Sequence, residues 1–361
     1  MKTKTALALI AAAVAALTHT AAAETRVSGV IDRETRWKAE DGPYILEGDL
    51  LIARFGNLVI MPGTRVIVSA DAKKGELAPP FDKADSTLVS IRVKGVLNCV
   101  GRRNNPIVFE PEKSGHVEFP WRGIILDKAD DRYTQIAFTE ISGATAGVTV
   151  KNTKSVVRNS AIENCNIGIL AVETGAPRIY NNLITGCFTA GIKVERSNPQ
   201  IHNNIIAFNS NLGLWCDNSS KIAVKYNCVF GNADGNFLDC DPELGKMSRA
   251  GGKGRDSTDA NGNITVDPIF AGSAAEALAI ELDVSLPTDS SKVKDKKLLG
   301  IANLPFGAPR KKEPTTLGSE VRQLSKYSPC VNAGDPAGEF KNADGSRNTM
   351  GPSGGQDFFS K

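Results

Sequence analysis

Two segments, PRIYNNLITGCFTAGIKV (residues 177–194) and PQIHNNIIAFNSNLGLWC (residues 199–216), carry the same pattern 22 residues apart. In each, an isoleucine stands two residues before an Asn-Asn pair, and a glycine followed by an aliphatic residue comes nine residues after that pair. A period of about 20–25 residues is typical of a solenoid in which each repeat is one coil. Within the repeat, apolar residues alternate over short β-rich segments, without an apolar run at helical spacing. The sequence therefore predicts an all-β fold, a parallel β-helix.

Aligning neighbouring repeats gives columns of residues that we expect to stack. Two columns are aliphatic and should point into the core, where each buried side chain contributes about 1.5–3 kcal/mol: Ile136, Val157, Ile179, Ile201 and Val224, and Ile141, Ile162, Ile184, Ile206 and Val229. A third column is polar and predicts a ladder of hydrogen bonds at a turn: Thr139, Ser160, Asn182, Asn204 and Asn227. Roughly ten coils at the parallel-strand spacing of about 4.8 Å would form a rod.

The two ends of the chain differ from this repeat. Lys2 and Lys4, an apolar run over residues 6–17 and three alanines ending at Ala23 predict a signal peptide over residues 1–23. No later apolar run approaches the roughly 20 residues of a membrane span. We therefore expect an exported protein, periplasmic or extracellular, without a membrane span.

The mature chain divides into three parts. Residues 24–43 are interpreted as an N-terminal lead-in or cap, and residues 44–240 as the β-helix. Residues 241–361 lose the periodicity and are rich in turn residues, with a Lys-rich insertion at about 272–327. Because an open solenoid end exposes strand edges and core, this region is predicted to be an irregular C-terminal cap.

The net charge bears on the possible partners, and the cysteine content bears on the possible disulfides. The net charge of +3 is close to balance, so nothing favours nucleic acid or an anionic membrane surface. The seven cysteines are an odd number for an exported protein. Cys165 and Cys187 occupy one column of neighbouring coils, which fits either a disulfide or a buried stack of thiols. The oligomeric state is left open.

Three blocks of sequence resemble the right-handed parallel β-helix proteins of the pectate-lyase-like superfamily, in particular exported bacterial members built of β-helix repeats. They are the early coils GVLNCVG, NPIVFEP and WRGIIL (residues 95–126), the Asn-Asn and Gly-Ile coils (157–216), and a terminal module with YNCVFGNADGNF, ITVDPIF, SPCVNAGDP and DGSRNTMGPSGG (226–355). The resemblance implies a right-handed solenoid. Since this fold carries lyases, hydrolases, esterases and binding modules, it does not by itself imply an activity.

Outward-facing positions are where a function would lie. Glu195, Asp217 and Asp239 are spaced by 22 residues each and are predicted to stack beside Lys193, Trp215 and Phe237. Closely spaced carboxylates fit a calcium site, or the acid pair of a glycosidase, and exposed aromatic rings can stack on sugars. The alternative is a solvated row of acids at a turn.

A second outward column consists of Arg158, Tyr180, His202 and Lys225. Planar and cationic groups in a row could bind an acidic polysaccharide, and the alternative is an ordinary solvent-facing β surface. No catalytic residue is assigned, because the polygalacturonase and lyase signatures of the superfamily are absent.

These observations lead to three hypotheses. The first is a non-catalytic exported β-helix that binds a carbohydrate or a cell-envelope partner. The second is a polysaccharide lyase or glycoside hydrolase that uses the acidic column as its catalytic site. The third is a purely structural or adhesion module. No cofactor is expected apart from calcium at the acidic column.

Overall fold

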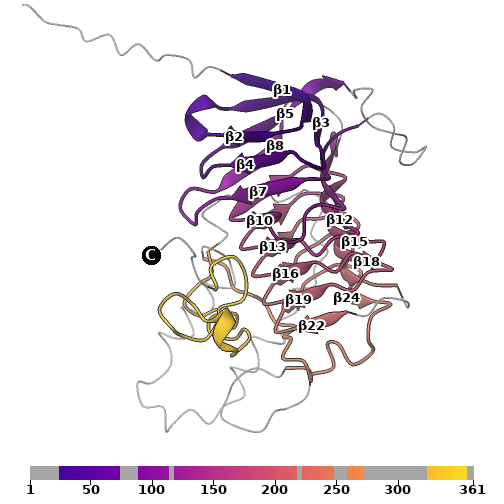
Figure 1. The fold of residues 1–361 in the computed structure, drawn as a ribbon. Helices are drawn as coiled ribbons and strands as arrows, with labels where there is room; N and C mark the ends of the chain where they lie inside the picture. Colours follow the sequence, from indigo (N-terminus) through magenta and orange to yellow (C-terminus); the bar gives the residue numbers. More distant parts are fainter. Residues whose placement is uncertain are drawn as a thin grey trace, which may run out of the picture.

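The structure, a computed structural model, describes residues 24–73, 88–113, 118–217, 222–247, 258–271, 273 and 323–355. The predicted signal peptide and most of the predicted insertion lie outside these residues. The described chain is a solenoid of parallel strands, shown in Figure 1. None of its helices is long and apolar enough to cross a membrane.

Each coil of the solenoid contributes strands to three faces. Face 1 is the eight-stranded sheet, formed by β2 (Glu34–Trp37), β4 (Asn57–Ile60), β7 (Val96–Val100), β10 (Gln135–Ala137), β13 (Val156–Arg158), β16 (Arg178–Tyr180), β19 (Gln200–His202) and β22 (Ala223–Lys225). Face 2 is formed by β5 (Arg65–Lys73), β8 (Ile107–Pro111), β11 (Thr139–Ser142), β14 (Ala161–Glu163), β17 (Leu183–Thr185), β20 (Ile205–Ala207) and β23 (Cys228–Phe230).

Face 3 carries the longer strands β6 (Val89–Val93), β9 (Trp121–Asp127), β12 (Ala146–Lys151), β15 (Ile167–Val172), β18 (Ala190–Glu195), β21 (Leu212–Trp215) and β24 (Gly235–Leu238). Strand β3 (Tyr44–Ile52) joins faces 2 and 3, because its first half pairs with β5 and its last three residues pair with β6. The eight strands of face 1 mark eight coils, fewer than the ten predicted.

The solenoid begins earlier than predicted. Strand β1 (Thr25–Ile31) pairs with β3, and β2 pairs with β4. Residues 24–43, interpreted above as a lead-in or cap, therefore form part of the first coil and contain the short 3-10 helix η1 (Ala39–Asp41). In this coil the Trp37 and Tyr44 rings stack with centroids 4.5 Å apart.

The predicted aliphatic columns are confirmed. Ile179 pairs with Ile201 on face 1, and Ile184 pairs with Ile206 on face 2, in the register that the repeat predicts. Both columns are fully or almost fully buried in one continuous core. Cys165 and Cys187 are buried free thiols, so the disulfide alternative is wrong and the thiol stack is confirmed. The disulfide in the structure joins Cys216 to Cys240, a pair that was not predicted.

The predicted polar ladder is also confirmed, and it is longer than expected. The amide oxygen of Asn204 accepts hydrogen bonds from the backbone and side-chain nitrogens of Asn182, at 3.0 Å each, and Asn227 does the same for Asn204. The ladder continues to Asn263, whose amide donates to Asp259 over 2.9 Å. Stacking of this kind gives the buried asparagines of the ladder hydrogen-bonding partners within the solenoid.

The turn residue just before the ladder position has a left-handed backbone in successive coils. Asn159, Asn181 and Asn203 have φ values of 48°, 56° and 57°. Asparagine adopts this conformation more readily than other non-glycine residues. The same three coils contact the C-terminal part of the chain, which uses these asparagines as hydrogen-bonding partners.

The irregular C-terminal region does two things. Residues 258–271 extend the last coil, since Ile264 bridges to Cys228. Residues 323–355, here called the C-terminal segment, lie beside the coils (Figure 1) and pack Cys330 and Met350 against Leu183 and Ile205 of face 2. The segment contains the 3-10 helix η4 (Gly338–Phe340). The predicted cap is thus partly an end piece and partly a lateral attachment.

Candidate functional site

The predicted acidic column does not assemble as expected. Glu195 forms an ion pair with Lys193 over 2.7 Å, and Asp217 accepts a hydrogen bond from the Arg196 backbone over 2.6 Å. Among the residues that the structure describes, no three His, Cys, Asp or Glu side chains are placed to hold a metal ion. The calcium site therefore stays a prediction without a coordinating group.

The register after Trp215 corrects the rest of this column. Trp215 pairs with Leu238, while Phe237 pairs with the inward residue Leu214 and packs against the core. Phe237 was predicted to face outward beside Trp215, and Asp239 to continue from Asp217. Both predictions are wrong by one position, because this coil spans 23 residues and a slip of one residue exchanges the two sides of a strand.

Trp215 and Lys193 contact each other directly on face 3. The Lys193 ammonium lies 4.0 Å from the centroid of the Trp215 ring. Because the same ammonium is paired with Glu195, one ring face is occupied by a neutralised cation. These residues form a closed set of contacts, which makes them a poorer platform for a sugar ring than predicted.

The second predicted column is present in the expected register. Arg158, Tyr180, His202 and Lys225 pair in succession across face 1. Their surroundings differ from an open surface, however. Arg158 is buried beside the Phe138 ring, and the Tyr180 and His202 rings meet Phe340 of the C-terminal segment at centroid distances of 6.0 and 5.8 Å.

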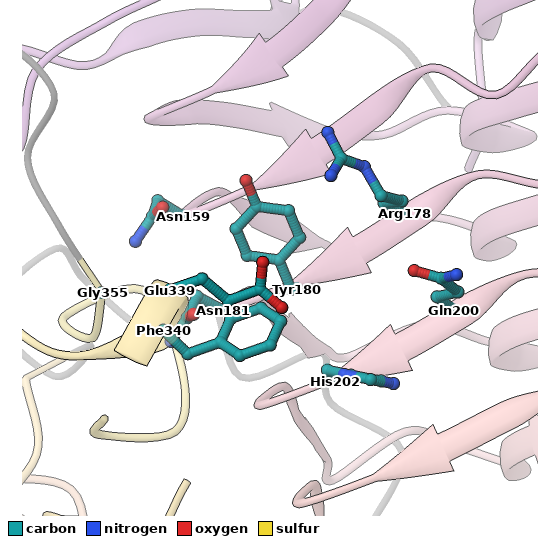
Figure 2. Close-up of a pocket in the computed structure, with 9 residues that line it drawn as sticks. All are labelled: Asn159, Arg178, Tyr180, Asn181, Gln200, His202, Glu339, Phe340 and Gly355. Atoms are coloured by element: carbon teal, nitrogen blue, oxygen red, sulfur yellow. The ribbon is translucent and has the colours of Figure 1, made fainter. Parts of the chain in front are cut away.

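A cleft of about 230 Å³ lies where face 1 meets the C-terminal segment. This aromatic cleft, drawn in Figure 2, is lined by Asn159, Arg178, Tyr180, Asn181, Gln200, His202, Glu339, Phe340 and Gly355. Strands β16 and β19 present Arg178 and Tyr180, then Gln200 and His202, and the segment presents Glu339 and Phe340 opposite them.

His202 is held on the inner side of this cleft. Its Nδ1 lies 3.9 Å from Asp335 Oδ2, and its Nε2 is buried without a hydrogen-bond partner among the described residues. Burial lowers the pKa of His202, which Asp335 partly offsets. Because Nε2 is not accessible, a general-base role for His202 gains no support from this geometry.

The C-terminal segment reaches this position through the left-handed asparagines. Asn181 Nδ2 donates to Asn348 Oδ1, Thr349 O and Gly351 O at 2.9–3.1 Å. One coil earlier, Asn159 donates to Gly354 O over 2.7 Å, and one coil later Asn203 accepts from the Asp335 backbone over 2.7 Å. These contacts fix Glu339 and Phe340 above face 1.

A second cavity, of about 670 Å³, follows the edge between faces 3 and 1. This basic trough was not predicted. It is lined by Arg54, Lys94, Asp127, Lys128, Asp130, Lys151, Asn152 and Glu173. Its four cations lie at the ends of neighbouring strands of face 3: Arg54 after β3, Lys94 after β6, Lys128 after β9 and Lys151 as the last residue of β12. Four successive levels of the solenoid therefore supply one cation each.

Two of the three trough carboxylates already have cationic partners. Lys151 pairs with Glu173 over 3.0 Å, and its hydrogen bond lowers the pKa of Glu173. The buried Arg92 lies 3.8 Å from Asp127. Asp130 accepts hydrogen bonds from backbone nitrogens of its own turn. Within the described residues, Arg54, Lys94 and Lys128 have no ion pair, so the trough is electropositive.

Two exposed aromatic residues are close in sequence to residues that line the trough. Phe55, which follows Arg54, is 87% exposed, and Tyr133, in the Asp130 turn, is 60% exposed. An exposed aromatic ring offers a flat apolar face on which a sugar ring can stack, and a neighbouring cation can pair with the acid group of that sugar. A search of coil ends for lysine could have found Lys94, Lys128 and Lys151.

A comparison with protein families supports the fold. The family described as "Right handed beta helix region" matches residues 116–267. No curated protein matches the sequence significantly. Two crystal structures of mutants of the periplasmic alginate epimerase AlgG align at 13% and 15% identity, with TM-scores of 0.27 and 0.20.

Each alignment covers 58% of this chain and 62% of the epimerase chain, so less than two thirds of that protein is matched. Identities and TM-scores this low give no basis for assigning the epimerase activity here. The family match over residues 116–267 and the parallel pairing of the described strands agree on the fold: the described part of the chain is a right-handed parallel β-helix.

Proposed function

We propose that the protein is an exported β-helix that binds an acidic polysaccharide along the basic trough without cleaving it. The observation that carries this proposal is one cation on each of four successive levels, Arg54, Lys94, Lys128 and Lys151. Parallel strands repeat at about 4.8 Å, so the cations form a row along the solenoid axis. An extended chain with one acid group per sugar can follow such a row.

The size and charge of the trough support the same ligand. A volume of about 670 Å³ falls within the roughly 300–1,000 Å³ of small-molecule sites, enough for a short stretch of a sugar chain. The unpaired Arg54, Lys94 and Lys128 would be neutralised by ligand carboxylates. Exposed ion pairs contribute about 0.2–1 kcal/mol each and are screened by salt, so binding depends on several of them together.

The absence of cleavage in this proposal rests on the acids of face 3. Glu195 is neutralised by Lys193, Asp217 is engaged by the Arg196 backbone, and Asp239 is out of register. A glycosidase needs two carboxyl groups about 5–9.5 Å apart across one sugar bond. The proposal therefore treats these acids as surface residues.

The test compares polygalacturonate with its fully methyl-esterified form, which keeps the sugar chain but removes the negative charges. We expect the full-length mature protein to bind only the charged form, and more weakly as salt rises. Removing two cations (Lys94→Ala with Lys128→Ala) should weaken binding about five- to tenfold. The matched control removes two cations elsewhere (Arg102→Ala with Lys341→Ala) and should leave binding unchanged.

Turnover separates the alternatives. Release of new sugar ends by the wild type, lost in the double variant Asp217→Asn with Asp239→Asn, would establish the enzyme hypothesis and overturn the non-catalytic one. Equal binding of both polymer forms would exclude recognition by the trough cations. Failure of a panel of acidic glycans to bind at all would favour the purely structural hypothesis.

A further inference from the structure

The aromatic cleft is separate from the basic trough and is not used by the proposed function. It lies between face 1 and the C-terminal segment, and both walls are fixed in place. Tyr180 and His202 stand on paired strands, and the segment is held by hydrogen bonds from Asn159 and Asn181. A cavity with two rigid walls is a better candidate for a binding site than an open surface.

Two opposite charges enter this cleft without partners. Arg178 and Glu339 are both exposed and line the cleft, and within the described part of the chain neither side chain has an ion pair or hydrogen bond. Gln200, the strand neighbour of Arg178, adds an amide at the same rim. The walls thus offer one cation and one anion to whatever occupies the space.

Both charges act on the Tyr180 hydroxyl. Burial raises the pKa of Tyr180, the cations Arg158 and Arg178 lower it, and Glu339 raises it. The phenol therefore lies within electrostatic reach of the guanidinium and the carboxylate. Its ring meets Phe340 edge to face at 6.0 Å, so the space between the two charges has an aromatic floor.

This combination selects among ligand classes. A guanidinium binds a carboxylate through two parallel hydrogen bonds. A carboxylate beside aromatic rings suits an ammonium group, which gains both an ion pair and a cation–π contact. A simple anion would be repelled by Glu339, and a neutral sugar would leave both charges unpaired.

We propose that the aromatic cleft binds a small zwitterion of the amino-acid class, with its carboxylate on Arg178, its ammonium facing Glu339 and its side chain against Tyr180 and Phe340. The volume of about 230 Å³ lies below the usual range for drug-sized ligands and limits the occupant to about one amino acid. The ligand can be a free amino acid or a residue that keeps both charges close together.

The test uses calorimetric titration of the full-length mature protein with amino acids from glycine to phenylalanine. For leucine, two derivatives remove one charge each: N-acetylleucine lacks the ammonium, and leucinamide lacks the carboxylate. We expect leucine to bind at least tenfold more tightly than either derivative. The dipeptide leucylleucine, in which the charges lie further apart, distinguishes a free amino acid from a peptide end.

Two variants test the orientation. Arg178→Gln should bind leucine and leucinamide equally, because the partner of the carboxylate is gone. Glu339→Gln should bind leucine and N-acetylleucine equally, for the corresponding reason. Arg102→Gln, a cation outside the cleft, should keep the wild-type preference. Circular dichroism confirms that each variant is folded.

Two results would overturn the proposal. One is that no amino acid in the panel binds at millimolar concentration. The other is that the wild-type protein binds leucine and both derivatives with equal affinity. Polysaccharide binding at the trough is measured on the same samples, so failure at the cleft is distinguishable from failure of the proposed function.

Discussion

The basic trough and the aromatic cleft lie on the same solenoid but are built in different ways. All the residues that line the trough belong to consecutive coils and the turns between them. The cleft needs three coils and also a segment more than 130 positions away in sequence, as the contact between Asn203 and Asp335 shows. The trough should therefore persist for as long as the coils are folded, whereas the cleft should also require the C-terminal segment to be docked.

The largest effect is expected for a change that destabilises the coils themselves, because both cavities depend on them. Asn204→Ala deletes a buried amide that donates to Ile179 O and His202 O and accepts from Asn182. Each buried hydrogen bond contributes about 0.5–1.5 kcal/mol, so we expect a loss of about 3 kcal/mol in the free energy of unfolding.

Urea denaturation measures this loss. Asn98→Ala, a half-buried asparagine on face 1 away from the ladder, is the control and should cost less than 1 kcal/mol. Both cavities should lose their ligands at the same denaturant concentration. A loss below about 1 kcal/mol for Asn204→Ala would show that the ladder does not hold the coils together.

A smaller and more selective effect is expected at Asn181. Replacement by glycine keeps the left-handed backbone but removes the three hydrogen bonds from Nδ2 to the C-terminal segment. The segment should become susceptible to proteolysis and cleft binding should fall, with about 2 kcal/mol less docking stability. Trough binding should be unchanged.

Asn152→Gly is the matched control, because it also replaces a left-handed asparagine but lies far from the segment, beside the trough. It should leave the rate of proteolysis at the wild-type value. Equal proteolysis of the wild type and Asn181→Gly would mean that the apolar contacts of Cys330 and Met350 hold the segment without Asn181.

The smallest effect concerns pH. Because burial lowers the pKa of His202 in the folded protein, the unfolded or undocked state binds a proton more readily. The stability from neutral His202 is present above the unfolded pKa of about 6.5 and is lost as the pH falls through the folded value. Docking of the segment should weaken below about pH 6.5.

Proteolysis of the segment between pH 5 and 8 measures this dependence. His202→Gln should remove the dependence while the described trough, which has no histidine in its lining, keeps its ligand affinity over the same range. A pH profile identical in His202→Gln and the wild type would assign the effect to another group.

Much of the solenoid could be predicted because one period sets many residues at once. Ile179 and Ile201 are 22 positions apart, as are Asn182 and Asn204. Because the coils stack in register, residues at this spacing occupy the same inward position or the same turn position in neighbouring coils. The prediction for Phe237 and Asp239 is wrong for the same reason. One extra residue changes the spacing to 23, and a glycine at 235 suggests the wrong alignment.

Only one of the two walls of the cleft could be predicted from the sequence. The column of Tyr180 and His202 follows from the repeat, but Glu339 and Phe340 come from a stretch with no periodicity. Their position depends on contacts between side-chain amides and a distant backbone, which leave no spacing in the sequence. For this reason the pairing of Asp335 with His202 could not be predicted from the sequence.

The left-handed asparagines have a consequence for how the rod can change in length. A whole coil could be inserted or deleted anywhere along the asparagine ladder, and every ladder amide would still find a neighbour above and below. The same insertion between Asn159 and Asn203 would change the spacing of the three anchoring amides by one level and leave the C-terminal segment unable to reach all of them. Docking of the C-terminal segment therefore requires a fixed number of coils between Asn159 and Asn203. A further coil is tolerated only before or after that range.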